Sequence, residues 1–350
     1  GVDHLAHRGM QGGDAVEGAG APGALGDPGR MLEDAFEAGK SYADLAEAVI
    51  AALWPVVTAE FALKHGEMPG RGAVVLGMGS LGAGRLNAGS DLDLILIYDA
   101  AGVETSGGPR PLAARAYYSR LTQAMVTALS AQTAEGRLYE VDVRLRPSGR
   151  QGPVATAIDS FRTYQETEAW TWEHLALTRA RVLAGDPGLA AEVETFRRAL
   201  LAAKGPGDSV LADVADMRRR LAEAKPGQGG WDAKFGPGRL MDIELLAQTL
   251  ALQAAIPARQ VERQIALGAK SSKLSHSDQE ALLDAYRLCW RLHCAARLLT
   301  DRAISPESLG EGGRAFLLRD CGVETGEALS ARVTTATALA ARVIDAHLQG

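Results

Sequence analysis

Cysteine is scarce in this sequence, which limits the class of protein it can be. The 350 residues contain three cysteines, at positions 289, 294 and 321, and no CxxC pair. Three cysteines cannot supply the disulfide framework of a small secreted domain, and without closely spaced pairs a zinc site is not indicated. We therefore expect a reducing compartment and predict a cytoplasmic protein.

Aromatic residues, basic charge and long apolar runs are also in short supply. Aromatics make up 5% of the chain, and 37 basic against 43 acidic residues give a net charge of −6. Nucleic-acid-binding proteins are usually basic, and single-strand binders need aromatic stacking platforms. The longest apolar runs, such as Leu94–Ile97, fall far short of the roughly 20 residues that span a bilayer, and no signal peptide is visible. We expect neither nucleic acid nor a membrane as a partner.

Glycine and helical periodicity divide the chain into three segments. Residues 1–30 hold nine glycines and almost no large apolar residues, which predicts a flexible linker. Residues 31–155 mix helical patterns with short apolar runs, which predicts a small α/β domain. Residues 156–350 carry almost only helical patterns and are predicted to form a helical domain.

The expected elements follow from local periodicity and breakers. A helix is predicted over 31–65, broken or kinked at Pro55. Strands are predicted over 73–76, 92–98 and 138–145, with a helix from 111 to 136 between the last two. Beyond them, helices are predicted over 157–184, 208–224, 239–254, 278–300, 312–320 and 326–348.

A GxGxxG match after the first predicted strand suggests a dinucleotide site, but the spacing excludes it. The match is Gly77 to Gly82, with Asp99 about 20 residues later. Only residues 83–90 remain for the crossover helix before the next strand. A βαβ crossover needs at least about 10–12 residues and an apolar face, so this interpretation fails.

The same stretch supports a metal–phosphate site. Asp91 and Asp93 stand two apart at the start of a strand, so both carboxylates leave one face. Two such carboxylates repel each other unless a cation lies between them, and oxygen ligands suit Mg²⁺. Gly79 and Ser80 offer backbone N–H groups and a hydroxyl to phosphate oxygens. The alternative is a turn with ordinary solvated carboxylates.

The third predicted strand adds charged residues on one face. In LYEVDVRLRP, Glu140, Asp142, Arg144 and Arg146 alternate with apolar residues. Asp142 is a candidate third metal ligand or general base, while Arg144 and Arg146 are candidates for neutralising phosphate charge. The alternative is a solvent-facing sheet surface.

Together these motifs resemble a known family. A glycine–serine turn, a DxD pair and a third aspartate on a later strand are typical of DNA polymerase β-like nucleotidyltransferases. GMGSLGAGRLNAGSDLDLILIYD, LYEVDVRLRPSGRQGP and EAWTWEHLALTRARVLAGDP resemble glutamine synthetase adenylyltransferase. The EAWTWEH stretch is similar to the C-terminal, adenylylating half of these bifunctional enzymes. The resemblance implies an α+β fold, in which a small mixed-sheet nucleotidyltransferase domain with flanking helices precedes an all-helical, bundle-like domain.

The resemblance also implies a reaction and its participants. AMP would pass from ATP to a tyrosine hydroxyl of glutamine synthetase, with Mg²⁺ as cofactor and the PII signal protein as regulator. The implied metal-binding and catalytic residues are Asp91, Asp93 and Asp142, and the implied nucleotide- and phosphate-binding residues are Gly79, Ser80, Ser90, Arg144 and Arg146. Two alternatives remain: the deadenylylating half of the same enzyme, or a non-catalytic domain that binds PII or glutamine synthetase.

Secondary candidates lie outside this core. The glycine-rich segment 227–238 contains Lys234, a candidate phosphate or partner contact, and precedes a helix carrying Asp242 and Glu244. Acidic residues in a first helical turn are also favoured by the helix dipole alone. His174, with Trp170 and Trp172, is a candidate lining of a protein-substrate site or else core. Ser80, Arg85 and Arg239 depart from the family pattern, which has lysine, glutamate and glycine there.

Overall fold

The computed structural model describes residues 28–349 apart from 135, 208, 273, 301, 303, 306 and 307. The predicted linker lies outside the described residues except for its last three, which begin a helix. The helices are α2 (Pro28–His65), α3 (Gly79–Gly82), α4 (Ala114–Ser130), α5 (Ile158–Thr167), α6 (Thr171–Leu177), α7 (Pro187–Lys204), α8 (Val210–Ala224), α9 (Leu240–Gln253), α10 (Val261–Gly268), α11 (His276–Leu299), α12 (Glu311–Asp320) and α13 (Gly326–Gln349). The strands are β1 (Gly72–Gly77), β2 (Leu92–Asp99), β3 (Gln132–Thr133), β4 (Gly136–Arg137), β5 (Val141–Asp142), β6 (Ala155–Ala157) and β7 (Arg181–Gly185).

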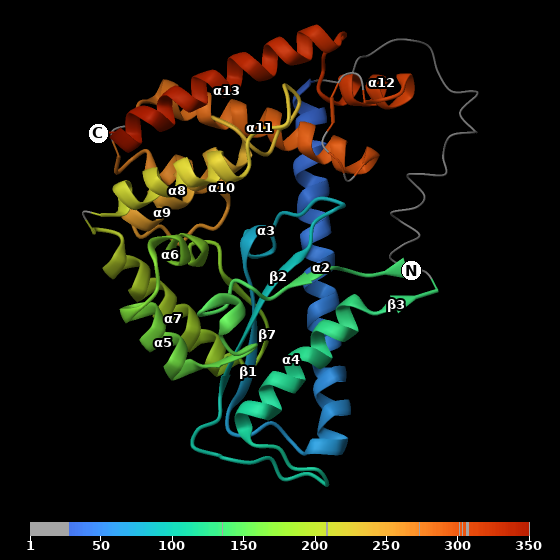
Figure 1. The fold of residues 1–350 in the computed structure, drawn as a ribbon, viewed down its shortest axis with the longest axis vertical. Coiled ribbons are helices and arrows are strands. Elements are labelled where there is room, and N and C mark those ends of the chain that lie inside the picture. The colour runs from blue at the N-terminus through green and yellow to red at the C-terminus, as the bar shows by residue number, and fades with distance from the viewer. Residues whose placement is uncertain are drawn as a thin grey trace.

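A five-stranded mixed sheet forms the centre of the lower half of the molecule (Figure 1). Its order is β5–β2–β1–β7, and β6 also pairs with β2. β1 pairs antiparallel with both β2 and β7, whereas the short β5 and β6 run parallel to opposite ends of β2. The long apolar strand β2 therefore holds the sheet together, and its first residues pair with β5.

Alternating side chains of the sheet enter two different cores. Leu92, Leu94 and Leu96 pack on the side of α2 and α4. Ile95 and Ile97 pack on the opposite side, with apolar residues of α5, α6 and α7. Because strand residues alternate between faces, Asp91 and Asp93 point to the same side as Ile95. That side faces the helices that follow the sheet in the chain.

A third core holds the upper, helical half together. It joins buried side chains of α9, α10, α11, α12 and α13 around residues such as Trp231 and Trp290. α11 starts at a capping box in which the Ser275 hydroxyl and the Asp278 carboxylate satisfy each other's backbone N–H groups. The fold is therefore α+β, with a small mixed-sheet domain and a helical bundle, as predicted.

The predicted helix over 157–184 is wrong. This segment contains β6, α5, α6 and β7. The Glu173 carboxylate accepts the backbone N–H of Trp170 and starts α6 anew, and residues 181–185 pair with β1 instead of continuing the helix. Pairing with a buried strand overrides local helical periodicity. The sheet therefore takes β7 from beyond residue 155, the predicted end of the first domain.

The predicted break at Pro55 is wrong, and the strand predicted over 138–145 is shorter than expected. α2 runs through Pro55 without a break, because contacts with α4, β7 and α11 hold the helix on both sides of the proline. The strand predicted over 138–145 shrinks to Val141–Asp142, followed by turns and a short 3₁₀ helix at Gly149–Gln151. α7 and α10 were not predicted, whereas the five helices predicted from residue 208 onward correspond to α8, α9, α11, α12 and α13.

One helix of the described chain is long and apolar enough to cross a membrane by composition. Its segment Ala35–His65 has a window of mean hydropathy 1.6, of which 22% is buried. The same helix packs along α4, β7 and α11, as helices bordering a core do. This feature is weak evidence for a membrane span, and the expectation that the chain has no membrane partner stays a prediction.

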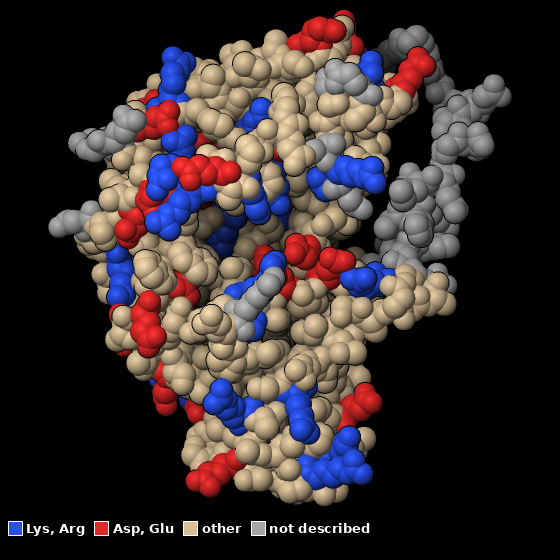
Figure 2. All heavy atoms as spheres, viewed as in Figure 1, with Lys and Arg blue, Asp and Glu red and all other residues tan. Residues whose placement is uncertain are grey.

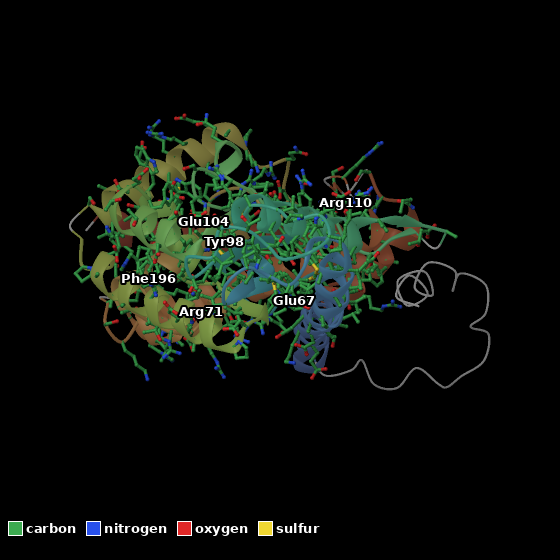
Figure 3. The ribbon with its side chains drawn as sticks, turned by 90° about the horizontal axis from the view of Figure 1, so that it is seen from below. Glu67, Arg71, Tyr98, Glu104, Arg110 and Phe196 are labelled. Carbon is green, nitrogen blue, oxygen red and sulfur yellow. The ribbon has the colours of Figure 1, made fainter. Side chains whose placement is uncertain are left out.

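The lower end of the sheet is closed by ion pairs. Arg71, just before β1, contacts Asp99 at the end of β2 at 3.0 Å and Glu192 of α7 at 2.7 Å. Figure 3 views the molecule from this end, with Arg71 labelled. The opposite end of β2, where Asp91 and Asp93 lie, faces the helical half (Figure 1).

Candidate functional site

The start of β2 brings the three predicted carboxylates together. Leu92 and Asp93 pair in parallel register with Val141 and Asp142 of β5, so Asp93 and Asp142 are direct neighbours across two strands. Asp91 precedes β2 and is exposed, whereas Asp93 is half-buried. The spacing predicted from sequence therefore places Asp91, Asp93 and Asp142 at one edge of the sheet.

The electrostatics of Asp93 follow from this crowding. Burial, with the neighbouring charges of Asp91 and Asp142, raises the pKa of Asp93 to about 6. The cations of Arg144 and Lys234 act in the opposite direction. The ionised form of Asp93 is thus destabilised by burial and by its neighbours' negative charge. A bound cation would offset this electrostatic cost, as expected for a metal ligand.

The glycine–serine turn lies directly against Asp93. The backbone N–H of Met78 donates to the Asp93 carbonyl at 2.9 Å, which joins the turn to β2. Gly79 has φ +52°, and a Cβ there would lie 2.4 Å from Asp93 Oδ2. Only glycine combines this backbone conformation with such a close approach. Ser80 follows, half-buried at the boundary with the helical half.

Ser90 shapes the loop rather than pointing at a ligand. Its Oγ accepts the backbone N–H of Asn87 at 2.9 Å, and its own N–H donates to the Asn87 carbonyl at 3.1 Å. This tight turn immediately precedes Asp91 and fixes where β2 begins. Ser90 therefore orients Asp91 by fixing the turn that precedes it.

Asp142 is engaged by Arg144. Its carboxylate accepts the backbone N–H of Arg144 at 2.8 Å and the side-chain Nε at 2.6 Å, with a further contact to Nη2. Among the described residues, no three His, Cys, Asp or Glu side chains stand arranged around a metal position. The carboxylate donors suit Mg²⁺, and Arg144 competes with a cation for the acceptor sites of Asp142.

Arg146 does not share the phosphate-facing side predicted for it. It is buried, and it donates to the backbone carbonyl of Val143 at 2.6 Å and to that of Gly152 at 3.3 Å. Burial lowers its pKa. The predicted alternation fails because β5 ends at Asp142, so Arg146 folds back and holds the following loop together.

A hollow separates the sheet half from the helical half near the start of β2. Figure 2 shows a hollow whose lower wall carries Asp and Glu, while Lys and Arg lie deep inside and along the upper wall. Lys234, in the loop before α9, belongs to the upper half and is exposed, and its charge acts on Asp93. The predicted phosphate contact thus lies within electrostatic range of Asp93, one of the predicted metal ligands.

Comparison with known sequences decides the family. A sequence model of glutamate–ammonia ligase adenylyltransferase matches residues 31–196, which include all three carboxylates. The chain belongs to the glutamate–ammonia ligase adenylyltransferase family. Three relatives are each named bifunctional glutamine synthetase adenylyltransferase/adenylyl-removing enzyme.

These relatives differ in source and in coverage. The protein of Mesorhizobium japonicum is 50% identical over 226 residues, covering 64% of this chain and 23% of the relative. The protein of Rhizobium meliloti is 44% identical over 297 residues, covering 81% of this chain and 30% of the relative. The protein of Xanthobacter autotrophicus is 44% identical over 294 residues, covering 82% of this chain and 30% of the relative. The chain therefore spans less than a third of the length of each of these three adenylyltransferase relatives.

The two acidic residues of α9 have different surroundings in this family member. Asp242 is buried and bonded to Arg218 and to the backbone N–H of Gly238 at 2.7 Å, so it holds the loop before α9 in place. Glu244 pairs with the buried Arg179 at 3.1 Å. Glu244 and Arg179 line a small crevice with Ser80, so Glu244 adjoins the glycine–serine turn. Asp242 does not line this crevice.

The EAWTWEH motif of the adenylyltransferase resemblance divides into buried and exposed residues. His174 is buried beside the Gln165 carbonyl at 3.0 Å, and burial lowers its pKa, so its role is structural. Trp170 and Trp172 remain 72% and 41% exposed. The core interpretation of the two tryptophans is therefore wrong. They leave aromatic surface on α6 that a protein partner can contact.

One connection between the halves escaped the sequence reasoning. Arg85, expected from the resemblance to depart from the family pattern, contacts Glu262 of α10 at 2.7 Å and the Tyr286 hydroxyl at 3.4 Å. Its guanidinium also lies 4.3 Å from the Phe36 ring centre. No local signal marks Glu262 as the partner, because 177 residues separate the two. Arg85 thereby ties the loop between α3 and β2 to the helical half.

Proposed function

We propose that this chain transfers AMP from ATP to a tyrosine hydroxyl of glutamine synthetase and releases pyrophosphate. The observation that carries the proposal is the in-register pair Asp93–Asp142, with Asp91 beside it and Lys234 across the cleft. The family model covers this arrangement, and the relatives are named for the same activity. The EAWTWEH motif favours the adenylylating half.

The proposed reaction is a single displacement at the α-phosphorus. The tyrosine oxygen forms a bond to this phosphorus, the bond to the bridging oxygen breaks, and pyrophosphate leaves with that oxygen. Asp142, once released by Arg144, accepts the phenolic proton. Arg144 is 58% exposed while Asp142 is 14% exposed, so the guanidinium can turn toward a triphosphate in the cleft. Positioning and charge neutralisation supply most of the acceleration in such reactions.

Mg²⁺ is the proposed cofactor, held by Asp91, Asp93 and Asp142. When bound, it supplies positive charge that neutralises the phosphates and polarises the attacked phosphorus. The raised pKa of Asp93 and the glycine cradle at Gly79 support a cation there. Lys234 and Arg144 then contact phosphate oxygens that the metal does not reach.

The direct test uses α-labelled ATP, Mg²⁺ and unmodified glutamine synthetase. Label should appear on a tyrosine of the target, and pyrophosphate should be released in equal amount. Asp93→Asn should abolish labelling, while the matched control Asp159→Asn, on the fully exposed side of α5, should label normally. Normal labelling by Asp93→Asn would exclude the metal assignment.

A second candidate is the reverse-direction activity that the relatives' names include, removal of the adenylyl group. Phosphate would attack the tyrosyl adenylate, restoring the tyrosine and releasing ADP. Adenylylated glutamine synthetase with inorganic phosphate tests it: ADP without ATP consumption would assign the removing activity. A cytoplasmic location and regulation by a PII protein are part of the same proposal, and Trp170 and Trp172 offer a contact surface for such a partner.

A further inference from the structure

The backbone of Arg179 is packed against the glycine–serine turn. Its carbonyl lies so close to α3 that a Cβ on Gly82 would stand 2.3 Å from the carbonyl oxygen. Two residues later the chain enters β7, where Arg181 pairs with Gly77 of β1. Because the turn itself contacts Asp93, the backbone of Arg179 is fixed relative to that carboxylate.

The guanidinium of Arg179 binds two side chains of α9 that stand one helical turn apart. The residue is buried, and its Nη1 donates to Glu244 Oε2 at 3.1 Å. In the amide orientation that satisfies both ends of Gln248, the amide oxygen lies 3.3 Å from Arg179 Nε and 3.2 Å from Nη2, while the nitrogen donates to the Leu175 carbonyl. The planar fork is therefore held on both of its edges, which fixes Arg179 relative to α9.

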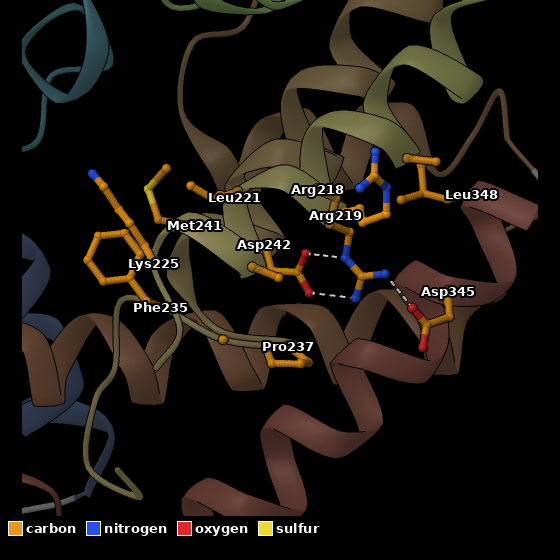
Figure 4. A pocket seen from close by; sticks show the side chains of 13 residues that line it. Arg218, Arg219, Leu221, Lys225, Phe235, Pro237, Met241, Asp242, Asp345 and Leu348 are labelled. Atoms are coloured by element: carbon orange, nitrogen blue, oxygen red, sulfur yellow. Dashed lines mark hydrogen bonds and ion pairs between the residues drawn. The ribbon is translucent and has the colours of Figure 1, made fainter. Parts of the chain in front are cut away.

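The same helix fixes the loop that carries Lys234. The backbone N–H of Met241 donates to the Lys234 carbonyl at 3.1 Å. The next residue, Asp242, is held by Arg218 of α8, which also bonds Asp345 of α13 (Figure 4). The start of α9 thereby anchors Lys234 to the helical half.

The crevice between α9 and the glycine–serine turn is too small for a substrate group. It has a volume of about 10 Å³ and is lined by Ser80, Arg179 and Glu244 among others. A single water already needs about 10–15 Å³ or more. A buried ion pair also adds little stability over apolar side chains of similar volume, because desolvation offsets the attraction. We conclude that the Arg179–Glu244 pair contributes a fixed geometry.

We propose that Arg179 is a positioning residue for the proposed adenylyl transfer, because it fixes Lys234 relative to Asp93. Glu244 and Gln248 connect Arg179 to α9, and α9 holds the Lys234 loop. The inference rests on the proposed function, in which Lys234 contacts phosphate while the aspartates hold the metal. A displacement of about 1 Å between such groups can cost about 100-fold in rate.

The first test is a double-mutant cycle in the adenylylation assay. Arg179→Lys keeps the positive charge, but an ammonium group cannot span both acceptors on α9. It should lower kcat about tenfold or more and change KM for ATP less than about twofold, because Arg179 touches no nucleotide. Lys234→Met should lower kcat/KM by removing the phosphate contact. The double variant should lose little more than the larger single loss, because a misplaced lysine and an absent one are nearly equivalent.

Arg71→Lys is the matched control for this cycle. Arg71 also bridges two carboxylates, those of Asp99 and Glu192, but at the opposite end of β2. This variant should retain the kcat of the wild type, and its effect should be additive with that of Lys234→Met. Coupling confined to Arg179 would therefore be specific to its place beside the site.

Hydrogen exchange without nucleotide, measured by mass spectrometry, gives a readout independent of turnover. Arg179→Lys should speed exchange in peptides covering 78–84 and 232–241, because these segments lose their common anchor, whereas Arg71→Lys should not. Gln248→Met removes half of the clamp without leaving a charge unpaired. It should speed exchange in the same peptides and lower kcat several-fold, which keeps the inference testable if Arg179→Lys folds poorly.

Additive losses of Arg179→Lys and Lys234→Met would overturn the inference, because they would show that Arg179 acts independently of Lys234. So would a wild-type kcat in both Arg179→Lys and Gln248→Met, or unchanged exchange at the two segments. Absence of target labelling by the wild type would instead refute the proposed function. Faster exchange in the variants would then still support the connection through Arg179, so the two failures are distinguishable.

Discussion

Replacing Asp93 by asparagine should stabilise the metal-free protein above pH 6, although the same change should abolish activity. The Asp93 carboxylate is partly buried beside two other aspartates, and its pKa is about 6 instead of 3.8. At 1.36 kcal/mol per pKa unit, this difference corresponds to about 3 kcal/mol of destabilisation when Asp93 is ionised. Asparagine has a similar shape and removes the charge, so most of that free energy should be recovered.

The sign of the pH dependence follows from the same values. The folded state holds the Asp93 proton more tightly than the unfolded state, so the penalty is absent well below pH 4. It develops as the pH rises from about 4 to 6 and is complete above that. The advantage of Asp93→Asn should therefore be about 3 kcal/mol at pH 8 and about 0.5 kcal/mol at pH 4.

The assay is urea unfolding with a chelator present, followed by circular dichroism at several pH values. Asp159→Asn, whose side chain is 91% exposed, serves as the control and should show no pH-dependent difference from wild type. An equal or lower stability of Asp93→Asn at pH 8 would refute the electrostatic description of the site. So would a gain that persists unchanged at pH 4.

Three further outcomes are expected. Arg85→Met should cost about 3–5 kcal/mol in urea unfolding because it leaves Glu262 without its partner, and adding Glu262→Gln should restore much of the loss. Gly79→Ala should reduce labelling of the target at least about tenfold at unchanged fold by circular dichroism, because the new methyl group displaces Asp93 Oδ2. Arg146→Met should speed proteolysis of the loop after β5, detected by mass spectrometry, because two backbone carbonyls lose their donor.

The position of Asp91 and Asp93 at one edge of the sheet could be predicted from sequence because the geometry there is local. Two aspartates two apart on a strand must share a face, and a glycine–serine turn next to that strand must lie close to them. Asp142 arrives through parallel pairing with β2 over only two residues, yet its place beside Asp93 was inferred correctly. The apolar strand pattern was sufficient for Asp91 and Asp93, whereas the family resemblance was needed to assign Asp142 to the same site.

The remainder depended on contacts distant in sequence. β7 looks helical by periodicity and becomes a strand only because β1 offers a free edge beside it. Arg146 was expected to alternate with Asp142, but the strand stops too early for that alternation to continue. Arg85 forms an ion pair with Glu262, 177 residues away in sequence, and no local sequence pattern predicts such a contact. In each case tertiary packing selected among structures that the local sequence allowed equally.

The two halves of the molecule present opposite charges to the region around Asp93. The sheet half presents Asp91, Asp93 and Asp142, which repel one another, and the helical half presents lysines around Phe235. In the structure Arg144 holds Asp142, so one cation already relieves part of the repulsion. In the proposed reaction a nucleotide would bring negative charge for the lysines and a metal would bring positive charge for the aspartates, so binding both would reduce the repulsion within each group. We expect Arg144 then to leave Asp142, which would couple release of the proposed proton acceptor to arrival of the substrate.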